Sequence, residues 1–300
     1  MNEHVNAPRG RPVTSQHAGV TVTRVGVNLG AEISGVDLRR PVSDGQFQAI
    51  DNALVENELI IFRDQDINSE QLMSFGRRFG VLTVHPFAPN EGKNAPELIK
   101  FRNDETTPPF GTDVWHSDET FRDEPPMATI LCAKEVPAVG GDTMFVSMSA
   151  AFDGLSDRMQ QYILGLDAIH DMKPFRPLFG KSEEERKNLQ HFELMYPPQL
   201  HPVVRIHPVT GRKSLFLASH IGTIVGWPRP EAMAFIRDLI EHATQAQFVY
   251  VHRWTQHDLV IWDNRTTMHR VRRFDDLNVV RDVRRTTTKS DGPTVAQEAA

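Results

Sequence analysis

The chain has 300 residues, of which 39% are hydrophobic and 24% charged, and its formal net charge at pH 7 is −6. This is the composition of a globular protein with an ordinary core, and the acidic balance without a basic domain argues against a nucleic-acid partner. The single cysteine, Cys132, excludes an intrachain disulfide and any cysteine-based zinc or iron–sulfur site, and its apolar surroundings favour a buried structural thiol.

The N-terminal residues, 1 to about 18, are polar and show no periodicity, which predicts a disordered arm. No stretch resembles a signal peptide, and none is long and apolar enough to span a bilayer. We therefore expect a cytoplasmic protein without a membrane partner.

The first predicted elements alternate between strand and helix. Residues 20–25 alternate in polarity, as in a half-buried strand. Ser43 with Gln46 forms a capping box that predicts a helix, and the apolar run 58–62 predicts the next strand. Asn68 with Gln71 predicts a second helix, which Gly80 would end.

Strand signals dominate the rest of the chain. Runs of β-branched or aromatic residues predict strands at 127–133, 214–217, 247–251 and 259–262. A charged helix should begin at Ser182 with Glu185, and another near Pro230 should carry Met233, Ile236 and Ile240 on one face.

This order of elements predicts a mainly β fold with helical additions, a β-sandwich or jelly roll. We expect a single domain over residues 19–289, with a helical insert at about 147–198 and a flexible tail at 290–300. Within the insert, residues 167–198 are rich in Phe, Pro and charge. They form either a lid over the site or a surface insert with no gating role.

Two histidines and an aspartate form the most informative motif. His116 and Asp118 are two residues apart, so a strand would point both side chains to one face, and His269 lies far downstream. Two His and one carboxylate make the ligand set of a mononuclear non-haem Fe(II) site. Zinc accepts the same ligands, so the triplet alone leaves the metal open.

Arg281 and Arg285 follow His269 on what should be the next strand. An Fe(II) site can take a chelating 2-oxo acid and O₂ in its open positions. The far carboxylate of 2-oxoglutarate would then be buried and would need a partner, which Arg supplies as a planar, bidentate cation. A pair of exposed strand-edge charges is the alternative interpretation.

Several segments between Val22 and Thr288 are similar to those of the TauD/TfdA family, the taurine and 2,4-dichlorophenoxyacetate dioxygenases that depend on Fe(II) and 2-oxoglutarate. The segments are 30–37, 59–65, 75–80, 115–121, 140–143, 201–205 and 262–269. The resemblance implies a double-stranded β-helix, or jelly-roll, fold. It also implies His116, Asp118 and His269 as iron ligands, with Fe(II), the cosubstrate 2-oxoglutarate and O₂ as cofactors.

The same resemblance implies the remaining site residues. Thr143 and Arg281 would bind 2-oxoglutarate, and His85 and Arg285 would bind the substrate, with no catalytic group beyond the metal centre. The chain after His269 is one residue longer than usual for the family. Arg281 is therefore preferred over Arg284 because it lies four residues before Arg285.

The implied reaction hydroxylates a small anionic substrate, such as an aryloxyalkanoate, alkyl sulfonate or sulfate, and releases succinate and CO₂. If the hydroxylated carbon bears an ether oxygen or a sulfonate, the product is cleaved. Ala88 replaces an aromatic residue of taurine-type members, and residues 204–213 and 241–254 are closer to the phenoxyacetate type. The family implies a homo-oligomer, a dimer or tetramer. A 2-oxoglutarate-independent metal hydrolase and a non-catalytic ligand-binding or sensor protein on the same barrel are the alternatives.

Overall fold

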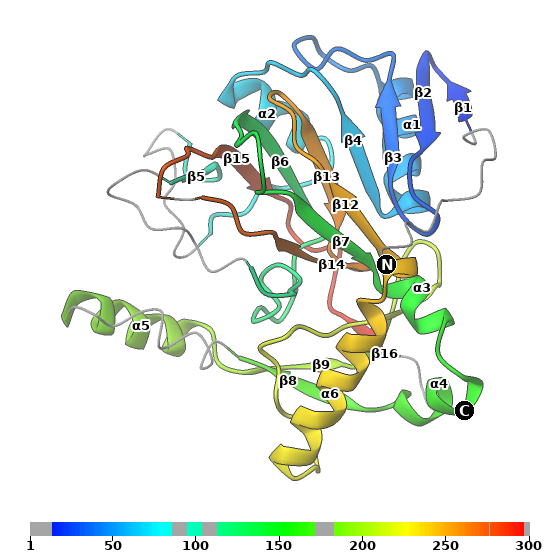
Figure 1. Cartoon of the computed structure of the whole chain (residues 1–300), viewed down its shortest axis with the longest axis vertical. Helices are drawn as coiled ribbons and strands as arrows, with labels where there is room; N and C mark the ends of the chain where they lie inside the picture. Colours follow the sequence, from blue (N-terminus) through cyan, green and yellow to red (C-terminus); the bar gives the residue numbers. More distant parts are fainter. Residues whose placement is uncertain (1–13, 86–94, 104–112, 172–182, 276, 297–300) are drawn as a thin grey trace.

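The computed structural model describes residues 14–85, 95–103, 113–171, 183–275 and 277–296. Ala88, which distinguishes the chain from taurine-type sequences, lies outside these residues. Half of the strands in the described residues belong to one eight-stranded sheet (Figure 1). In spatial order its strands are β1 (Thr14–His17), β2 (Val20–Arg24), β3 (Ala31–Ser34), β4 (Leu59–Phe62), β13 (Leu259–Asp263), β6 (Ala128–Glu135), β15 (Asp282–Thr287) and β5 (Ile99–Arg102).

A three-stranded sheet packs against the inner face of the large sheet. It consists of β12 (Val249–His252), β7 (Thr143–Ser147) and β14 (Thr267–Val271). A second three-stranded sheet holds β11 (Lys213–Leu215), β10 (Val204–Ile206) and β16 (Val295–Ala296), and β8 (Asp167–His170) pairs with β9 (Gln199–Pro202). Two facing sheets around a common apolar core confirm the predicted jelly roll.

The burial of β4 on both faces shows how the layers form. Ile60 and Phe62 point to the outer face, where they pack in a cluster with residues of α1 (Asp44–Asn57) and α2 (Ser69–Gly76). Leu59 and Ile61 point inward, to the cluster that holds Phe145 of β7. Alternate residues of a strand face opposite sides, so a strand between two apolar layers is apolar throughout.

Both N-terminal capping boxes are present. Ser43 and Gln46 cap α1 reciprocally, and Asn68 and Gln71 do the same for α2. The predicted end of the second helix at Gly80 was wrong, because α2 ends at Gly76 and the chain continues in turns. A Cβ at Gly76 would lie 3.1 Å from Thr286 Cγ2 of β15, so the last residue of the helix packs closely against the sheet.

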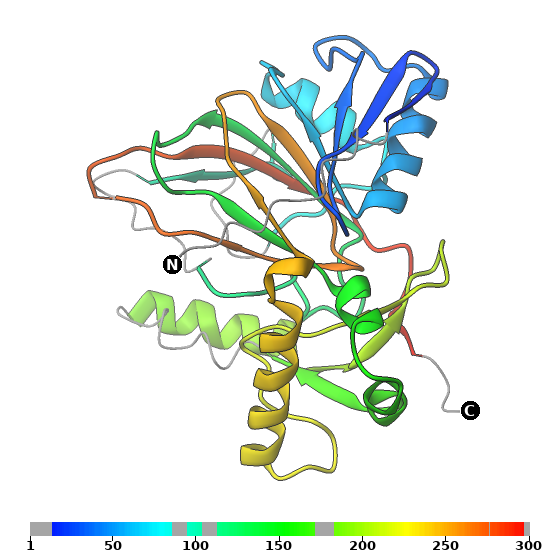
Figure 2. The same cartoon turned by 45° about the vertical axis from the view of Figure 1, so that its right-hand side comes forward.

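The remaining helices are α3 (Met148–Asp153), α4 (Asp157–Ile163), α5 (Glu183–Met195), α6 (Arg229–Ala243) and a 3-10 turn, Ala246–Phe248. They lie below the sheets, with α6 running down the molecule (Figures 1 and 2). The buried face of α6 holds Ile236 and Ile240 as predicted, but Met233 is half exposed and Ala232 faces the core instead.

The ends of the domain differ from the prediction. Residues 14–17, assigned to a disordered arm, form β1 and pair with β2 through a two-residue turn at Ala18 and Gly19. Both turn residues have positive φ, the conformation that joins tight hairpins. At the other end, β16 falls in the predicted flexible tail and pairs with β10.

The helical insert predicted at 147–198 contains α3, α4, β8 and α5. Residues 172–182 of the proposed lid, which include Ser182, lie outside the described residues, and its movement stays a prediction. Cys132 is fully buried, as expected, and burial raises the pKa of its thiol to about 11. Among the described helices, none is long and apolar enough to cross a membrane.

Candidate metal centre

The backbones of two distant segments hold the two histidines side by side. His116 N donates to His269 O at 3.0 Å, and His269 N donates to His116 O at 2.8 Å. His269 lies in β14, where it pairs with Phe145 of β7. His116 forms only this isolated bridge, and Asp118 begins a turn in which Glu119 has a φ of 48°. The expectation that one strand presents both His116 and Asp118 was therefore wrong, and a turn brings the carboxylate to the histidines.

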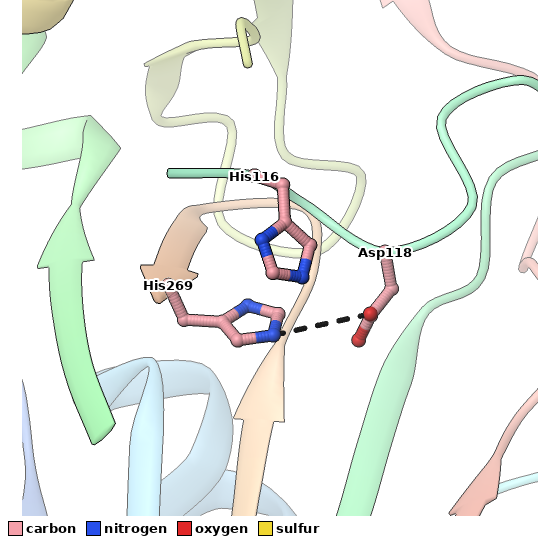
Figure 3. A group of neighbouring side chains, drawn as sticks. All are labelled: His116, Asp118 and His269. Carbon is pink, nitrogen blue, oxygen red and sulfur yellow. Dashed lines mark ion pairs between the residues drawn. The ribbon is translucent and has the colours of Figure 1, made fainter. Parts of the chain in front are cut away.

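The three predicted metal ligands converge. One ligand atom from each of His116, Asp118 and His269 lies within 4.8 Å of the others. His269 Nε2 is 3.9 Å from Asp118 Oδ1, and the two imidazole rings are 4.3 Å apart at their centres (Figure 3). Asp118 and His269 are buried. This arrangement can hold one divalent ion by three protein atoms on one side, which leaves the other side for further ligands.

The protonation states suit a metal. Burial lowers the pKa of His116 and lowers that of His269 to about 3, so both rings are neutral at pH 7. The Nδ1 atom of His116 lies 2.8 Å from Val114 O, which acts as an acceptor, so Nε2 carries the free lone pair. Burial alone would raise the pKa of Asp118, but Arg285 and the two imidazoles hold it below its usual range. The carboxylate is therefore ionised.

Arg285 lies against the aspartate. Its Nη2 atom is 3.0 Å from Asp118 Oδ1 and 3.7 Å from Glu119 Oε1, and its Nε donates to Thr287 Oγ1 at 3.2 Å. Burial lowers the pKa of His85 to about 4, and the charges of Glu119, Arg285 and Asp118 influence this pKa less. The structure thus places the guanidinium of Arg285 against Asp118, and the imidazole of His85 is neutral at pH 7.

Arg281 and Thr143 meet at Trp254. The indole Nε1 donates to Thr143 Oγ1 at 2.9 Å, and the Arg281 guanidinium lies 5.9 Å from the centre of the indole ring system. Arg281 is 9% exposed, and its Nε and Nη2 atoms are buried without a hydrogen-bond partner. Burial lowers the pKa of Arg281 to about 10. A buried cation that no carboxylate among the described residues neutralises suits an incoming anion.

Arg281, Arg284 and Arg285 do not all lie on the same face of β15. Arg281, just before β15, and Arg285 lie an even number of residues apart and share the inner face. Arg284 has the opposite parity and forms an ion pair with Asp282. This placement favours Arg281 over Arg284 as the residue that binds 2-oxoglutarate.

Several residues that contact the centre carry no recognisable signal in the sequence. Thr129 Oγ1 donates to Asp118 Oδ2 at 2.7 Å, and Asn264 Nδ2 donates to Thr129 Oγ1 at 2.9 Å. Trp254 contacts both predicted 2-oxoglutarate residues. Burial lowers the pKa of His220 to about 3, so its imidazole is neutral at pH 7. Asn264 belongs to a segment that resembled the family, so its presence was visible in the sequence but its contact was not.

Comparisons with known proteins agree with this geometry. The model of the taurine catabolism dioxygenase TauD, TfdA family matches residues 20–287. The 2,4-dichlorophenoxyacetate dioxygenase of Cupriavidus pinatubonensis, which is alpha-ketoglutarate-dependent, is 34% identical over 278 residues, 87% of this chain and 94% of the relative. The sulfate ester dioxygenase of Pseudomonas putida is 30% identical over 288 residues, 93% of each.

Solved structures share the fold. The crystal structure of AAD-2 in complex with Mn(II) and N-oxalylglycine has a TM-score of 0.77 and 38% identity, over 92% of this chain and 99% of that chain. A taurine dioxygenase from Burkholderia xenovorans has a TM-score of 0.78 and 29% identity, over 94% of this chain and 96% of that chain.

Proposed function

This chain belongs to the taurine catabolism dioxygenase TauD, TfdA family, and we propose that it hydroxylates a small anionic substrate, with aryloxyalkanoates as the favoured class. It is an alpha-ketoglutarate-dependent dioxygenase that requires Fe(II), 2-oxoglutarate and O₂. The family assignment disfavours a metal hydrolase and a sensor without turnover, the two alternatives that the sequence left open.

The residues present fit these cofactors. His116, Asp118 and His269 offer two neutral imidazoles and an ionised carboxylate, which is the donor set that Fe(II) takes in this class of site. When bound, the iron supplies the activation of O₂ that is coupled to conversion of 2-oxoglutarate to succinate and CO₂. The protein holds the ion on one side only.

The guanidinium of Arg281 is the main structural support for a site that binds 2-oxoglutarate. Its buried Nε and Nη2 atoms can donate two parallel hydrogen bonds to the far carboxylate of 2-oxoglutarate. Thr143, which contacts the same Trp254 side chain as Arg281, offers a hydroxyl for a further hydrogen bond. Binding of a dicarboxylate at this site would explain why the guanidinium of Arg281 is buried without a carboxylate partner among the described residues.

Arg285 and His85 would bind the anionic group of the substrate. Arg285 supplies the charge, and the neutral imidazole of His85 can donate one hydrogen bond. The 2,4-dichlorophenoxyacetate dioxygenases of Cupriavidus pinatubonensis and Burkholderia sp. share 34% and 32% identity with this chain, against 30% for the sulfate ester dioxygenase. We therefore place aryloxyalkanoates ahead of sulfonates and sulfate esters.

The test is O₂ consumption and succinate release by the purified protein with Fe(II) and 2-oxoglutarate. A panel of aryloxyalkanoates, alkyl sulfonates and alkyl sulfates should contain at least one compound that stimulates both, and an aryloxyalkanoate should stimulate them most. Product formation without 2-oxoglutarate would instead indicate a hydrolase. Binding of 2-oxoglutarate with no stimulation by any compound would refute the substrate class and favour a sensor.

A further inference from the structure

A chain of three hydrogen bonds ends on the metal-site aspartate. Trp262 Nε1 donates to Asn264 Oδ1 at 3.0 Å, Asn264 Nδ2 donates to Thr129 Oγ1 at 2.9 Å, and Thr129 Oγ1 donates to Asp118 Oδ2 at 2.7 Å. All four side chains are at most 3% exposed. We call Trp262, Asn264 and Thr129 the aspartate relay.

Chemistry fixes the direction of this relay. An indole N–H can only donate, so Asn264 must present its oxygen to Trp262 and its amide hydrogens to Thr129. The Thr129 hydroxyl, which accepts from Asn264, then directs its own proton to Asp118 Oδ2. Every group therefore has one defined role, and the last donor always points at the same carboxylate oxygen.

The relay ties a ligand in a turn to the rigid part of the fold. Thr129 lies in β6 and Trp262 in β13, and the two residues are paired across the large sheet. Asn264 follows β13 directly, and its N–H donates to Met127 O at 2.8 Å. Asp118 belongs to no strand. Its orientation is thus set by the sheet, as expected for partners that orient metal ligands.

We propose that the aspartate relay occupies Asp118 Oδ2 so that only Oδ1 binds the metal. Oδ1 is the oxygen that faces His269 Nε2, at 3.9 Å. Arg285 also contacts Oδ1, but each carboxylate oxygen accepts in two directions, so this contact leaves room for an ion. This inference rests on the proposed role of Asp118 as a metal ligand.

One-oxygen binding matters for the reaction. A carboxylate can bind a metal through one oxygen or both. Three protein atoms on one side of an octahedral ion leave three positions, two for the 2-oxo acid and one for O₂. An aspartate that used both oxygens would take one of these positions. Thr129 and Asn264 are therefore positioning residues that keep a coordination position open.

The experiment measures metal binding and coordination without turnover. The metal-free protein is titrated with Mn(II), and free Mn(II) is followed by its electron paramagnetic resonance signal. Thr129→Val keeps the shape of the side chain but removes the donor, and should weaken Mn(II) binding by about 10- to 100-fold. Thr129→Ser keeps the hydroxyl and should bind nearly as well as the unaltered protein.

A second measurement reports the coordination itself. The visible spectrum of the Co(II)-loaded protein should change in Thr129→Val, because a released Oδ2 alters the coordination number, and should be preserved in Thr129→Ser. Asn264→Leu, which breaks the relay one step earlier, should shift the same spectrum less. If Thr129→Val fails to fold, Asn264→Leu provides the test of the aspartate relay.

A matched control comes from the same region. Thr266 is 4% exposed and its hydroxyl has no hydrogen-bond partner, so Thr266→Val removes a buried hydroxyl without breaking the relay and should leave Mn(II) affinity unchanged. Thr129→Val with unaltered Mn(II) affinity and an unaltered Co(II) spectrum would overturn the relay. Asp118→Ala with unaltered Mn(II) affinity would instead overturn the metal site itself, so the two failures are distinguishable.

Discussion

Replacement of Arg281 by methionine should weaken the binding of 2-oxoglutarate and stabilise the protein without ligand. The side chain is 9% exposed, and two of its nitrogens are buried without a partner. Burial lowers its pKa from the ordinary value of 12.5 to about 10, which corresponds to an unfavourable free energy of roughly 3 kcal/mol for the buried charge. Removal of the charge, or binding of an anion beside it, should eliminate this unfavourable free energy.

The expected loss of 2-oxoglutarate affinity can be derived from this free energy of roughly 3 kcal/mol. If 2-oxoglutarate recovers roughly 3 kcal/mol at Arg281, then Arg281→Met should weaken its binding by roughly 100-fold, since about 1.4 kcal/mol corresponds to tenfold. The protein without ligand should become more stable, with a melting temperature a few degrees higher. Because Arg284 lies on the other face of β15 and is paired with Asp282, Arg284→Met should leave 2-oxoglutarate binding unchanged.

Thermal unfolding with Mn(II) and graded 2-oxoglutarate measures both effects. At a 2-oxoglutarate concentration 100 times the dissociation constant, the unaltered protein should gain about 2.7 kcal/mol, and the variant at that concentration only about 0.4 kcal/mol. A variant that melts lower without ligand and still shows the full 2-oxoglutarate shift would refute the reasoning. Arg281 would then be a structural residue.

Three further outcomes are expected. Asp118→Ala should abolish substrate-dependent succinate formation, measured by chromatography, because it removes the carboxylate of the three candidate protein ligands; full activity would exclude Asp118 from the ligand set. Arg285→Ala should raise the KM of the anionic substrate by about 10- to 100-fold and that of 2-oxoglutarate much less, whereas equal effects would move the substrate anion elsewhere. Burial raises the pKa of Glu58 to about 7, above its ordinary 4.5, so its contribution to stability is fully present below about pH 4.5 and is lost as the pH rises through about 7. Chemical denaturation at pH 5 and pH 8 should show a loss of up to roughly 3 kcal/mol that Glu58→Gln reduces, and equal pH dependence in both proteins would contradict this assignment.

The sequence predicted the fold where local signals were strong. Both capping boxes placed α1 and α2, because Ser43 and Asn68 satisfy N–H groups within their own turns. The hairpin of β1 and β2 was missed because Ala18 carries no usual signal for a positive φ. The exposed Met233 shows that a periodic pattern gives a helix but not the rotation at which the helix packs.

For the site, the residue types were predictable and several contacts were not. His116, Asp118 and His269 were recognised from type and resemblance, and the structure brings them together. The partner of Asp118 was not recognised, because Thr129 looks like any β-branched residue of a strand. The contacts of Thr129 with Asn264 and Trp262 depend on a sheet pairing between residues that are far apart in sequence. Such long-range pairing leaves no local pattern in a single sequence.

The order of strands in the large sheet has a consequence for how the protein is made. β13 lies between β4 and β6, and β15 lies between β6 and β5, so strands from the last part of the chain fill the middle of the sheet. During synthesis, β4 and β6 emerge long before the strand that joins them, and pairings of this range form slowly. His269 and both inner arginines arrive at the same late stage. The set of three candidate ligands is therefore complete only once His269 has been synthesised, and a chain that ends before β13 lacks both the strand between β4 and β6 and the third ligand.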